Sequence, residues 1–296
     1  MLYLVIFIFP ILINSQVLDT DLSDGLNTEG VSIKYLEGSS EPFKGHVFNY
    51  YPNGNRELKG NYSRGLKEGK WVWWYPDGEK NKTGYYVRSL EDSIWQWWFK
   101  NGQLMKRGKY KKGKKEGRWS EWYEDGTLAN SFGYINNKPN GKCLKKFANG
   151  GKQIEIMYNY GIKSGIEKEW NENGIPVYEN NWKDGLKDGA QIIWAGNGLI
   201  LSKHRYSKGM LHGEYIDYYK SGQKSIVGNY RFGKKHGTWT YSYKDGVVAL
   251  SGNYRNGDPK GSWFWIRANK SEMVNVDDPD KDWVTKRIRE WERIYN

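Results

Sequence analysis

The sequence has 296 residues with 16 Trp, 23 Tyr and 36 Gly, a mean hydropathy of −0.87 and a formal net charge of +12. It is too polar for a bundle of membrane-spanning helices and too aromatic for a disordered chain. Its length would suit two ordinary globular domains, but a repeat array is the alternative that must be tested first.

The N-terminal residues 1–15 resemble a signal peptide. Residues 2–13 form an apolar run of the right length, and this run is too short to span a bilayer comfortably. Ser15 supplies a small residue for cleavage, although no Lys or Arg precedes the run, so a short uncleaved anchor is the alternative. We therefore expect an exported protein that is periplasmic, bound to the cell surface or secreted. Cys143 is the single cysteine, so no intramolecular disulfide can form.

Three columns of residues recur every 24 positions without insertion. One column is glycine, a second is glycine interrupted once by serine, and a third is aromatic. They include Gly54, Gly78, Gly102 and Gly126 in the first column, Gly69 and Ser93 in the second, and Tyr62 in the third. A register kept over so many copies argues against two separate globular domains and for a repeat array.

Each repeat contains two short aromatic-rich runs, such as "LKGNY" (58–62) and "KWVWWY" (70–75). Asp77-Gly78 follows the second run, and Asn-Gly or Asp-Gly recurs at this position in most repeats. These pairs are strong hairpin signals because a type I′ turn needs positive φ at both central residues. The pattern predicts two antiparallel strands per repeat, with turns on alternate edges and type I′ geometry at Asn-Gly and Asp-Gly.

Strand alternation places Trp71 and Trp73 on one face of the predicted sheet, and Val72 and Trp74 on the other. Like positions then stack from repeat to repeat, so that aromatic ladders replace a globular core. The ladder of position 71 consists of Trp71, Trp95, Trp119, Trp239 and Trp263. The same column holds Cys143, Glu167 and Gln191 in the middle repeats, where we expect a bend, a change of twist or a looser segment near residues 141–198.

The predicted fold class is all-β, an elongated single-layer antiparallel sheet of consecutive β-hairpin repeats with a C-terminal capping helix. We expect a signal peptide at 1–15, a linker at 16–29, the repeat array at 30–266, a second linker at 267–279 and the helix at 280–296. Asp277, Asp278 or Asp280 would provide the N-cap of that helix. Its side facing the last hairpin would carry Trp283, Arg287, Ile288, Trp291, Ile294 and Tyr295.

The spacing in "GNYSRGLKEGKWVWWYPDG" (60–78) and "GNYRFGKKHGTWTYSYKDG" (228–246) resembles the MORN repeat in its bacterial variant form. The resemblance covers about residues 30–266. It implies consecutive β-hairpins in an elongated, twisted, single-layer sheet, and it does not imply an enzyme. Bacterial members are often labelled after antitoxin-like proteins. Eukaryotic MORN proteins have been linked to phospholipid binding and self-association, and both are expectations by analogy of fold.

The sequence contains no H-E-x-x-H, G-x-S-x-G or P-loop motif, so we expect no enzyme activity, no metal and no cofactor. His212 and His236 lie one repeat apart, in a column that elsewhere holds Lys, Glu, Asp, Asn or Ser. This tolerance indicates an exposed turn, and a metal site is the less favoured alternative. Cys143 occupies a ladder position and is expected to be a packed thiol.

The turns between the two runs of each repeat carry most of the net charge of +12, whereas the Asn-Gly and Asp-Gly turns carry no such excess. One edge of the sheet should therefore be electropositive and suit an anionic partner, such as lipid headgroups, an acidic polymer or an acidic protein. The candidate residues of this edge are Arg64, Lys111, Lys112, Lys114, Lys115, Arg231, Lys234 and Lys235.

A second candidate surface is the column of Trp73, Trp97, Tyr241 and Trp265, provided that this face of the sheet is exposed to solvent. The alternative, which we favour, is that these rings are simply packed within the ladder. We expect a non-enzymatic, exported scaffold or binding protein that presents its ladders and basic edge to a protein or an anionic envelope surface. Self-association is left open, and no nucleic acid is expected. The alternatives are an antitoxin- or immunity-type interaction protein and a carbohydrate-binding module.

Overall fold

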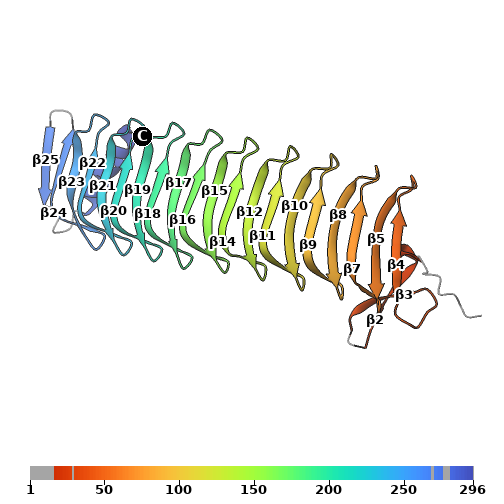
Figure 1. The fold of residues 1–296 in the computed structure, drawn as a ribbon. Coiled ribbons are helices and arrows are strands. Elements are labelled where there is room, and N and C mark those ends of the chain that lie inside the picture. Colours follow the sequence, from red (N-terminus) through yellow and green to blue (C-terminus); the bar gives the residue numbers. More distant parts are fainter. Residues whose placement is uncertain (1–16, 29, 268–269, 276–280, 296) are drawn as a thin grey trace, which may run out of the picture. The chain divides into compact units, whose positions relative to one another are not determined.

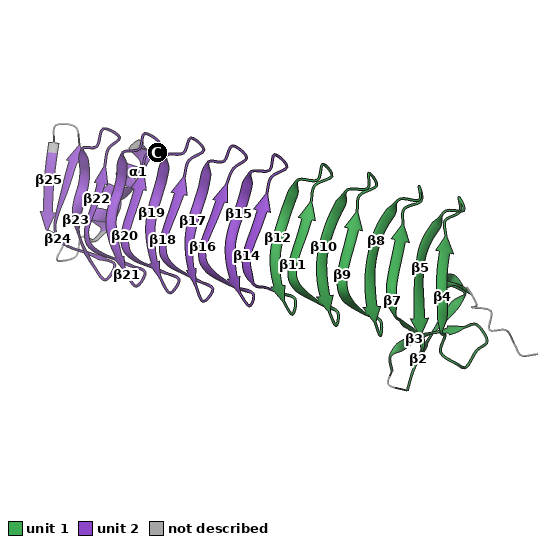
Figure 2. Cartoon of the chain, viewed as in Figure 1, with its two compact units in different colours: residues 1–138 green, residues 139–296 purple. Residues whose placement is uncertain are grey.

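The computed structural model describes residues 17–28, 30–267, 270–275 and 281–295. The predicted signal peptide lies outside these residues. The chain divides into two compact units, Met1–Lys138 and Pro139–Asn296, which are coloured separately in Figure 2. Each unit is built from consecutive β-hairpins in chain order (Figure 1).

Unit 1 begins with short elements and continues as regular hairpins. Its elements are β1 (Val17–Leu18), the 3-10 helix η1 (Asp19–Asp21), β2 (Leu22–Leu26), β3 (Ser32–Leu36), β4 (Gly45–Tyr50), β5 (Arg56–Ser63), β6 (Leu66–Lys67), β7 (Gly69–Trp74), β8 (Lys80–Val87), β9 (Leu90–Trp98), β10 (Leu104–Lys111), β11 (Lys114–Trp122) and β12 (Leu128–Ile135). The short strand β13 (Lys138–Pro139) falls on the unit boundary.

Unit 2 continues the same pattern and ends in a helix. Its elements are β14 (Gly141–Lys146), β15 (Lys152–Asn159), β16 (Ile162–Trp170), β17 (Pro176–Lys183), β18 (Leu186–Trp194), β19 (Ile200–Ser207), β20 (Met210–Tyr218), β21 (Lys224–Arg231), β22 (Lys234–Ser242), β23 (Val248–Arg255), β24 (Asp258–Arg267), β25 (Lys270–Asn275) and α1 (Lys281–Tyr295). The predicted all-β fold of antiparallel hairpin repeats with a C-terminal helix is confirmed.

The two edges of each repeat close with different turns. Ser63 pairs with Leu66, so Arg64 and Gly65 form a two-residue turn whose φ values, +52° and +73°, are those of type I′. On the other edge, the Tyr75 N–H donates to the Glu79 carbonyl, which leaves a three-residue loop with positive φ at Gly78. The prediction of type I′ geometry at Asn-Gly and Asp-Gly is therefore wrong, because these loops need a left-handed residue only at the glycine.

The ladder rings interlock edge to face. Tyr62 and Trp71 have ring centroids 5.3 Å apart, Trp71 and Tyr86 6.0 Å, and Tyr86 and Trp95 5.1 Å, with interplanar angles near 90° in each pair. Such T-shaped contacts add about 0.5–1.5 kcal/mol each to the free energy of burying the rings. Trp71 and Trp95 are buried, so the ladder supplies the core of the regular repeats.

Both units have end structures that the repeat pattern does not contain. In unit 1, Leu22 of β2 and Phe43 pack against Leu58, Tyr62 and Trp71, and β1 pairs in parallel with β4. The described part of the predicted 16–29 linker is thus structured. These apolar contacts cover rings that would otherwise face solvent at the first repeat.

In unit 2, β25 pairs with β24, although residues 267–279 were predicted to be a linker. Helix α1 packs on the ladder face of β22 to β24: the Trp291 ring lies 5.3 Å from the Tyr241 ring, and Trp291 Nε1 donates to the Ser242 carbonyl at 3.1 Å. Val284, which the predicted helix face omitted, is fully buried there. The predicted N-cap aspartates and the side chains of Ile294 and Tyr295 lie outside the described part of the chain.

The middle repeats fill the ladder with hydrogen-bonded polar groups instead of rings. Buried Glu167 accepts hydrogen bonds from Lys163 Nζ and Trp182 Nε1, each at 2.8 Å, and Gln191 Nε2 donates to Asn180 Oδ1 at 2.8 Å. Cys143 is a buried thiol, as expected. The strands β14 to β19 pair as consecutive hairpins, and the expected bend, change of twist or looser segment stays a prediction.

Candidate interaction edge and aromatic face

The basic residues of the predicted edge lie on the two-residue turns, which we call the turn edge. In unit 1, Lys112 takes the left-handed first position of its turn with φ of +50°, as Arg64 does in the earlier turn. Lys111 and Lys114 flank the Lys112 turn as a Cα pair, and Arg231 and Lys234 form the equivalent pair in unit 2. All six side chains are exposed, so their charges are available to a partner.

Lys115 and Lys235 occupy a different environment from the other predicted edge residues. Lys235 Nζ lies 4.4 Å from the Trp239 ring centroid and 5.1 Å from that of Tyr254, and it donates to the Tyr241 hydroxyl at 2.9 Å. Lys115 Nζ lies 4.8 Å from the Trp119 ring and 5.0 Å from the Tyr134 ring. Burial lowers the pKa of both lysines. Their ammonium groups therefore pack on the ladder as cation–π partners, and the exposed edge is smaller than predicted.

Neighbouring turns are tied together by side chains that accept hydrogen bonds. Glu68 accepts from the Arg88 N–H at 3.0 Å, Asp92 from the Lys112 N–H at 3.2 Å, and His212 Nδ1 from the Phe232 N–H at 3.3 Å. Most members of this column therefore act as acceptors, but His236 differs from His212, because its Nδ1 is buried without a hydrogen-bond partner among the described residues. Among the described residues no group of three or more metal-ligating side chains is found.

Exposed apolar side chains share the turn edge with the cations, and the sequence analysis missed them. Phe232 is 61% exposed beside Arg231, and the apolar residues of neighbouring turns are also exposed. These residues are Val87 and Leu90 in unit 1, and Tyr160, Ile162, Leu186 and Met210 in unit 2. The signal was present in the sequence, since apolar residues recur at turn positions that cannot face a core.

The predicted aromatic contact face is closed at one of its two ends. In unit 2, Tyr241 and Trp265 are only 1% and 4% exposed because α1 covers them. The prediction that they contact a partner is therefore wrong at these two positions, and the packed-ring alternative holds there. In unit 1, Trp73 and Trp97 are half-buried, and Lys82 Nζ lies 4.0 Å from the Trp73 ring centroid.

The geometry defines a β-hairpin repeat protein with interlocked rings, glycine turns and a 24-residue period. The family model described as "MORN repeat variant" matches six segments: residues 44–64, 67–88, 91–112, 115–136, 163–184 and 235–256. The chain is a MORN repeat protein. Repeats of this family generally mediate binding to proteins or membranes, and their scaffold is typically non-enzymatic. The bacterial, antitoxin-labelled form stays a prediction.

Comparison with curated proteins gives no match. Similar solved structures include the one titled "Crystal Structure of TcdB2-TccC3-Cdc42", with 9% identity and a TM-score of 0.18 over 87% of this chain. This chain spans 15% of the length of that one. Within the described residues, no helix is both long and apolar enough to cross a membrane.

Proposed function

We propose that the chain is an exported, non-enzymatic scaffold that binds an anionic envelope surface through its turn edge. The observation that supports this most directly is that exposed cations lie beside exposed apolar side chains on the same turns, as at Arg231 and Phe232. Within the described residues, no ion pair involves Arg231. Cations next to a headgroup region contribute about 1 kcal/mol each, and apolar turn residues can enter the interface between headgroups and acyl chains. Export rests on residues 1–15 alone.

The proposal is tested by sedimenting the full chain with vesicles of phosphatidylglycerol or of phosphatidylcholine at two salt concentrations. We expect binding to the anionic vesicles that weakens with salt, because exposed charges are screened within about 10 Å at 0.1 M salt. The variant Lys111→Glu/Lys112→Glu should bind less. Lys220→Glu/Lys224→Glu is the matched control, since it makes the same charge change beside the opposite edge. Absence of binding at both salt concentrations, or an equal loss in the control, would refute the proposal.

A further inference from the structure

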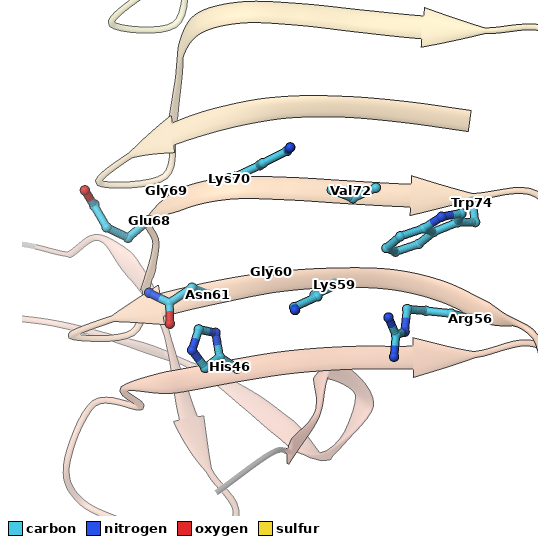
Figure 3. A pocket seen from close by; sticks show the side chains of 10 residues that line it. All are labelled: His46, Arg56, Lys59, Gly60, Asn61, Glu68, Gly69, Lys70, Val72 and Trp74. Atoms are coloured by element: carbon cyan, nitrogen blue, oxygen red, sulfur yellow. The ribbon is translucent and has the colours of Figure 1, made fainter. Parts of the chain in front are cut away.

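A second positively charged site lies in unit 1, on a face of the sheet rather than on the two-residue turns. It is a hollow of about 540 Å³ on the sheet face of β4, β5 and β7 (Figure 3). Strand alternation forms it: Lys59 of β5 and Lys70 and Val72 of β7 point to the face opposite the Trp71 ladder. His46 of β4 and Arg56 of β5 complete the basic lining.

Within the described residues, the cations of this hollow are not neutralised by a carboxylate. No ion pair joins Arg56, Lys59 or Lys70 to another residue in the described part of the chain. Glu68 lines one end of the hollow, so the three cations and this carboxylate leave a net positive charge. Uncompensated cations gathered in one concave site favour an anionic ligand.

An equivalent position in unit 2 shows which anion the site suits. Glu155 stands in the column of Lys59, and its carboxylate is held by Lys142 at 2.8 Å and by Lys152 at 3.0 Å. Lys142 and Lys152 stand in the columns of His46 and Arg56 respectively. Unit 1 therefore has basic side chains, His46 and Arg56, at the two positions that flank the carboxylate in unit 2. At the position of that carboxylate, Glu155, unit 1 has Lys59. A carboxylate supplied from outside would provide the negative charge that these cations lack.

The remaining lining indicates what carries that carboxylate. Trp74 forms an aromatic wall, with the Arg56 guanidinium carbon 5.7 Å from its ring centroid, and Val72 adds an apolar surface. Asn61 and Glu68 at the other end can accept hydrogen bonds from hydroxyl groups. Arg56 and Asn61 are five positions apart along an extended strand, or about 16 Å, which exceeds the length of one sugar ring.

We propose that this hollow binds a segment of an acidic polysaccharide, with uronate carboxylates on Arg56, Lys59 and Lys70 and a sugar ring against Trp74. The apolar faces of sugar rings stack on indole, and a uronate chain offers both carboxylates for the cations and hydroxyl groups for the acceptors, which lie beside Lys70 at the end of the hollow away from Trp74 (Figure 3). A nucleic acid strand fits less well, because Glu68 would face its phosphates and the hollow offers a single aromatic ring for base stacking.

The test is calorimetric titration of the full chain with an oligogalacturonate, a neutral cello-oligosaccharide of equal length and a single-stranded oligonucleotide of equal charge. We expect the oligogalacturonate to bind and the neutral sugar not to bind. Lys59→Glu, which installs the residue type of Glu155, should weaken binding about tenfold or more. Trp74→Leu should also weaken it, with circular dichroism confirming that the variant is folded.

Lys203→Glu is the matched control, because Lys203 stands in the column of Lys59 in another repeat. It should leave oligogalacturonate binding unchanged, and so should Lys111→Glu/Lys112→Glu, which separates this site from the turn edge. The proposal is overturned by absence of oligogalacturonate binding at low salt, by equal binding of the neutral sugar, or by equal loss in Lys203→Glu. Tighter binding of the oligonucleotide through Lys59 would assign the site to nucleic acid instead.

Discussion

The indole of Trp95 lies against the backbone of Gly84, where a β-carbon would stand 2.2 Å from ring atoms Cδ2 and Cε2. The same contact recurs wherever the ladder has tryptophan: Gly60 with Trp71, Gly108 with Trp119, Gly228 with Trp239 and Gly252 with Trp263. Where the tryptophan is replaced, the glycine is replaced too, by Phe132, Ile156, Asn180 and His204. In these tryptophan repeats the ring occupies space that a side chain at the glycine would need, whereas in the other repeats both positions carry side chains, as in the stacked rings of His204 and Tyr215, 3.9 Å apart.

Gly84→Ala should lower the free energy of unfolding by about 1–3 kcal/mol, because the new methyl group forces the Trp95 ring out of its packed position. Chemical denaturation followed by tryptophan fluorescence measures this. Gly196→Ala is the control: nothing lies within 4 Å of its added β-carbon, and its φ is not left-handed. A glycine of that kind is expected to gain about 0.4–1 kcal/mol on substitution by alanine. Equal effects at the two sites would show that ring contact is not the reason for glycine at residue 84.

The polar pair Asn180 and Gln191 replaces the glycine and tryptophan of a regular repeat and is buried and hydrogen-bonded at 2.8 Å. Gln191→Trp alone should destabilise the protein, because its ring would overlap Asn180. Asn180→Gly alone leaves the Gln191 amide with one partner fewer, at a cost of about 1–3 kcal/mol. The double variant restores the regular pair, so a double-mutant cycle should give a favourable coupling of at least about 1 kcal/mol. Additive effects would contradict a shared volume.

The sequence predicted the repeat period, the strand order and the sites of the turns, since these depend on local spacing. It did not distinguish the turn types. Asn-Gly is compatible both with a type I′ turn and with a three-residue loop in which only the glycine is left-handed. The glycine-turn interpretation does not hold for Gly60, which lies within β5 and has its backbone against the Trp71 ring, a contact with the paired strand that local spacing does not reveal. The exposure of the Tyr241 and Trp265 rings depends on where α1 packs. The repeat pattern carries no information about the position of this helix.

Lysines that look alike in the sequence divide into two roles in unit 2. Lys235→Met should cost about 0.5–2 kcal/mol, because its ammonium packs near the Trp239 ring and donates to the Tyr241 hydroxyl. Lys234→Met, at the exposed neighbouring position, should change stability by less than about 0.5 kcal/mol while weakening binding to anionic vesicles. Urea denaturation and vesicle sedimentation of both variants give the two readouts. Equal loss of stability in both would contradict the division.

Ser93 takes the left-handed conformation, φ +59°, at a position where glycine stands in the other repeats, such as Gly117 with φ +66°. A residue with a β-carbon pays about 1–2 kcal/mol there, and glycine avoids this cost but loses more entropy on folding. Ser93→Gly should therefore raise the free energy of unfolding by about 0.5–1 kcal/mol. Gly117→Ser is the reciprocal variant and should lower it by a similar amount. A stabilising Gly117→Ser would show that φ does not decide the residue at this column.

Stability should fall at alkaline pH because of the ladder tyrosines. Burial raises the pKa of Tyr86 to about 12, with the charge of Glu91 acting in the same direction. Burial is also the main cause of the raised pKa of Tyr62, Tyr215 and Tyr241. Tyrosine in the unfolded chain ionises near pH 10, so the unfolded state loses protons first. The tyrosine contribution is complete below about pH 10 and is lost as pH rises toward the folded pKa.

Buried lysines act in the opposite direction over a lower range. The pKa values of Lys67, Lys115 and Lys235 are lowered by burial, so their contribution improves with pH until unfolded lysine loses its proton near pH 10.4. Above about pH 10.4 only the tyrosine contribution to the free energy of unfolding still changes, and it decreases. Urea midpoints measured between pH 8 and about 11.5 should therefore fall above that pH. Tyr86→Phe removes one titrating group and should flatten the decline. An unchanged slope in Tyr86→Phe would rule out the buried ring as its source.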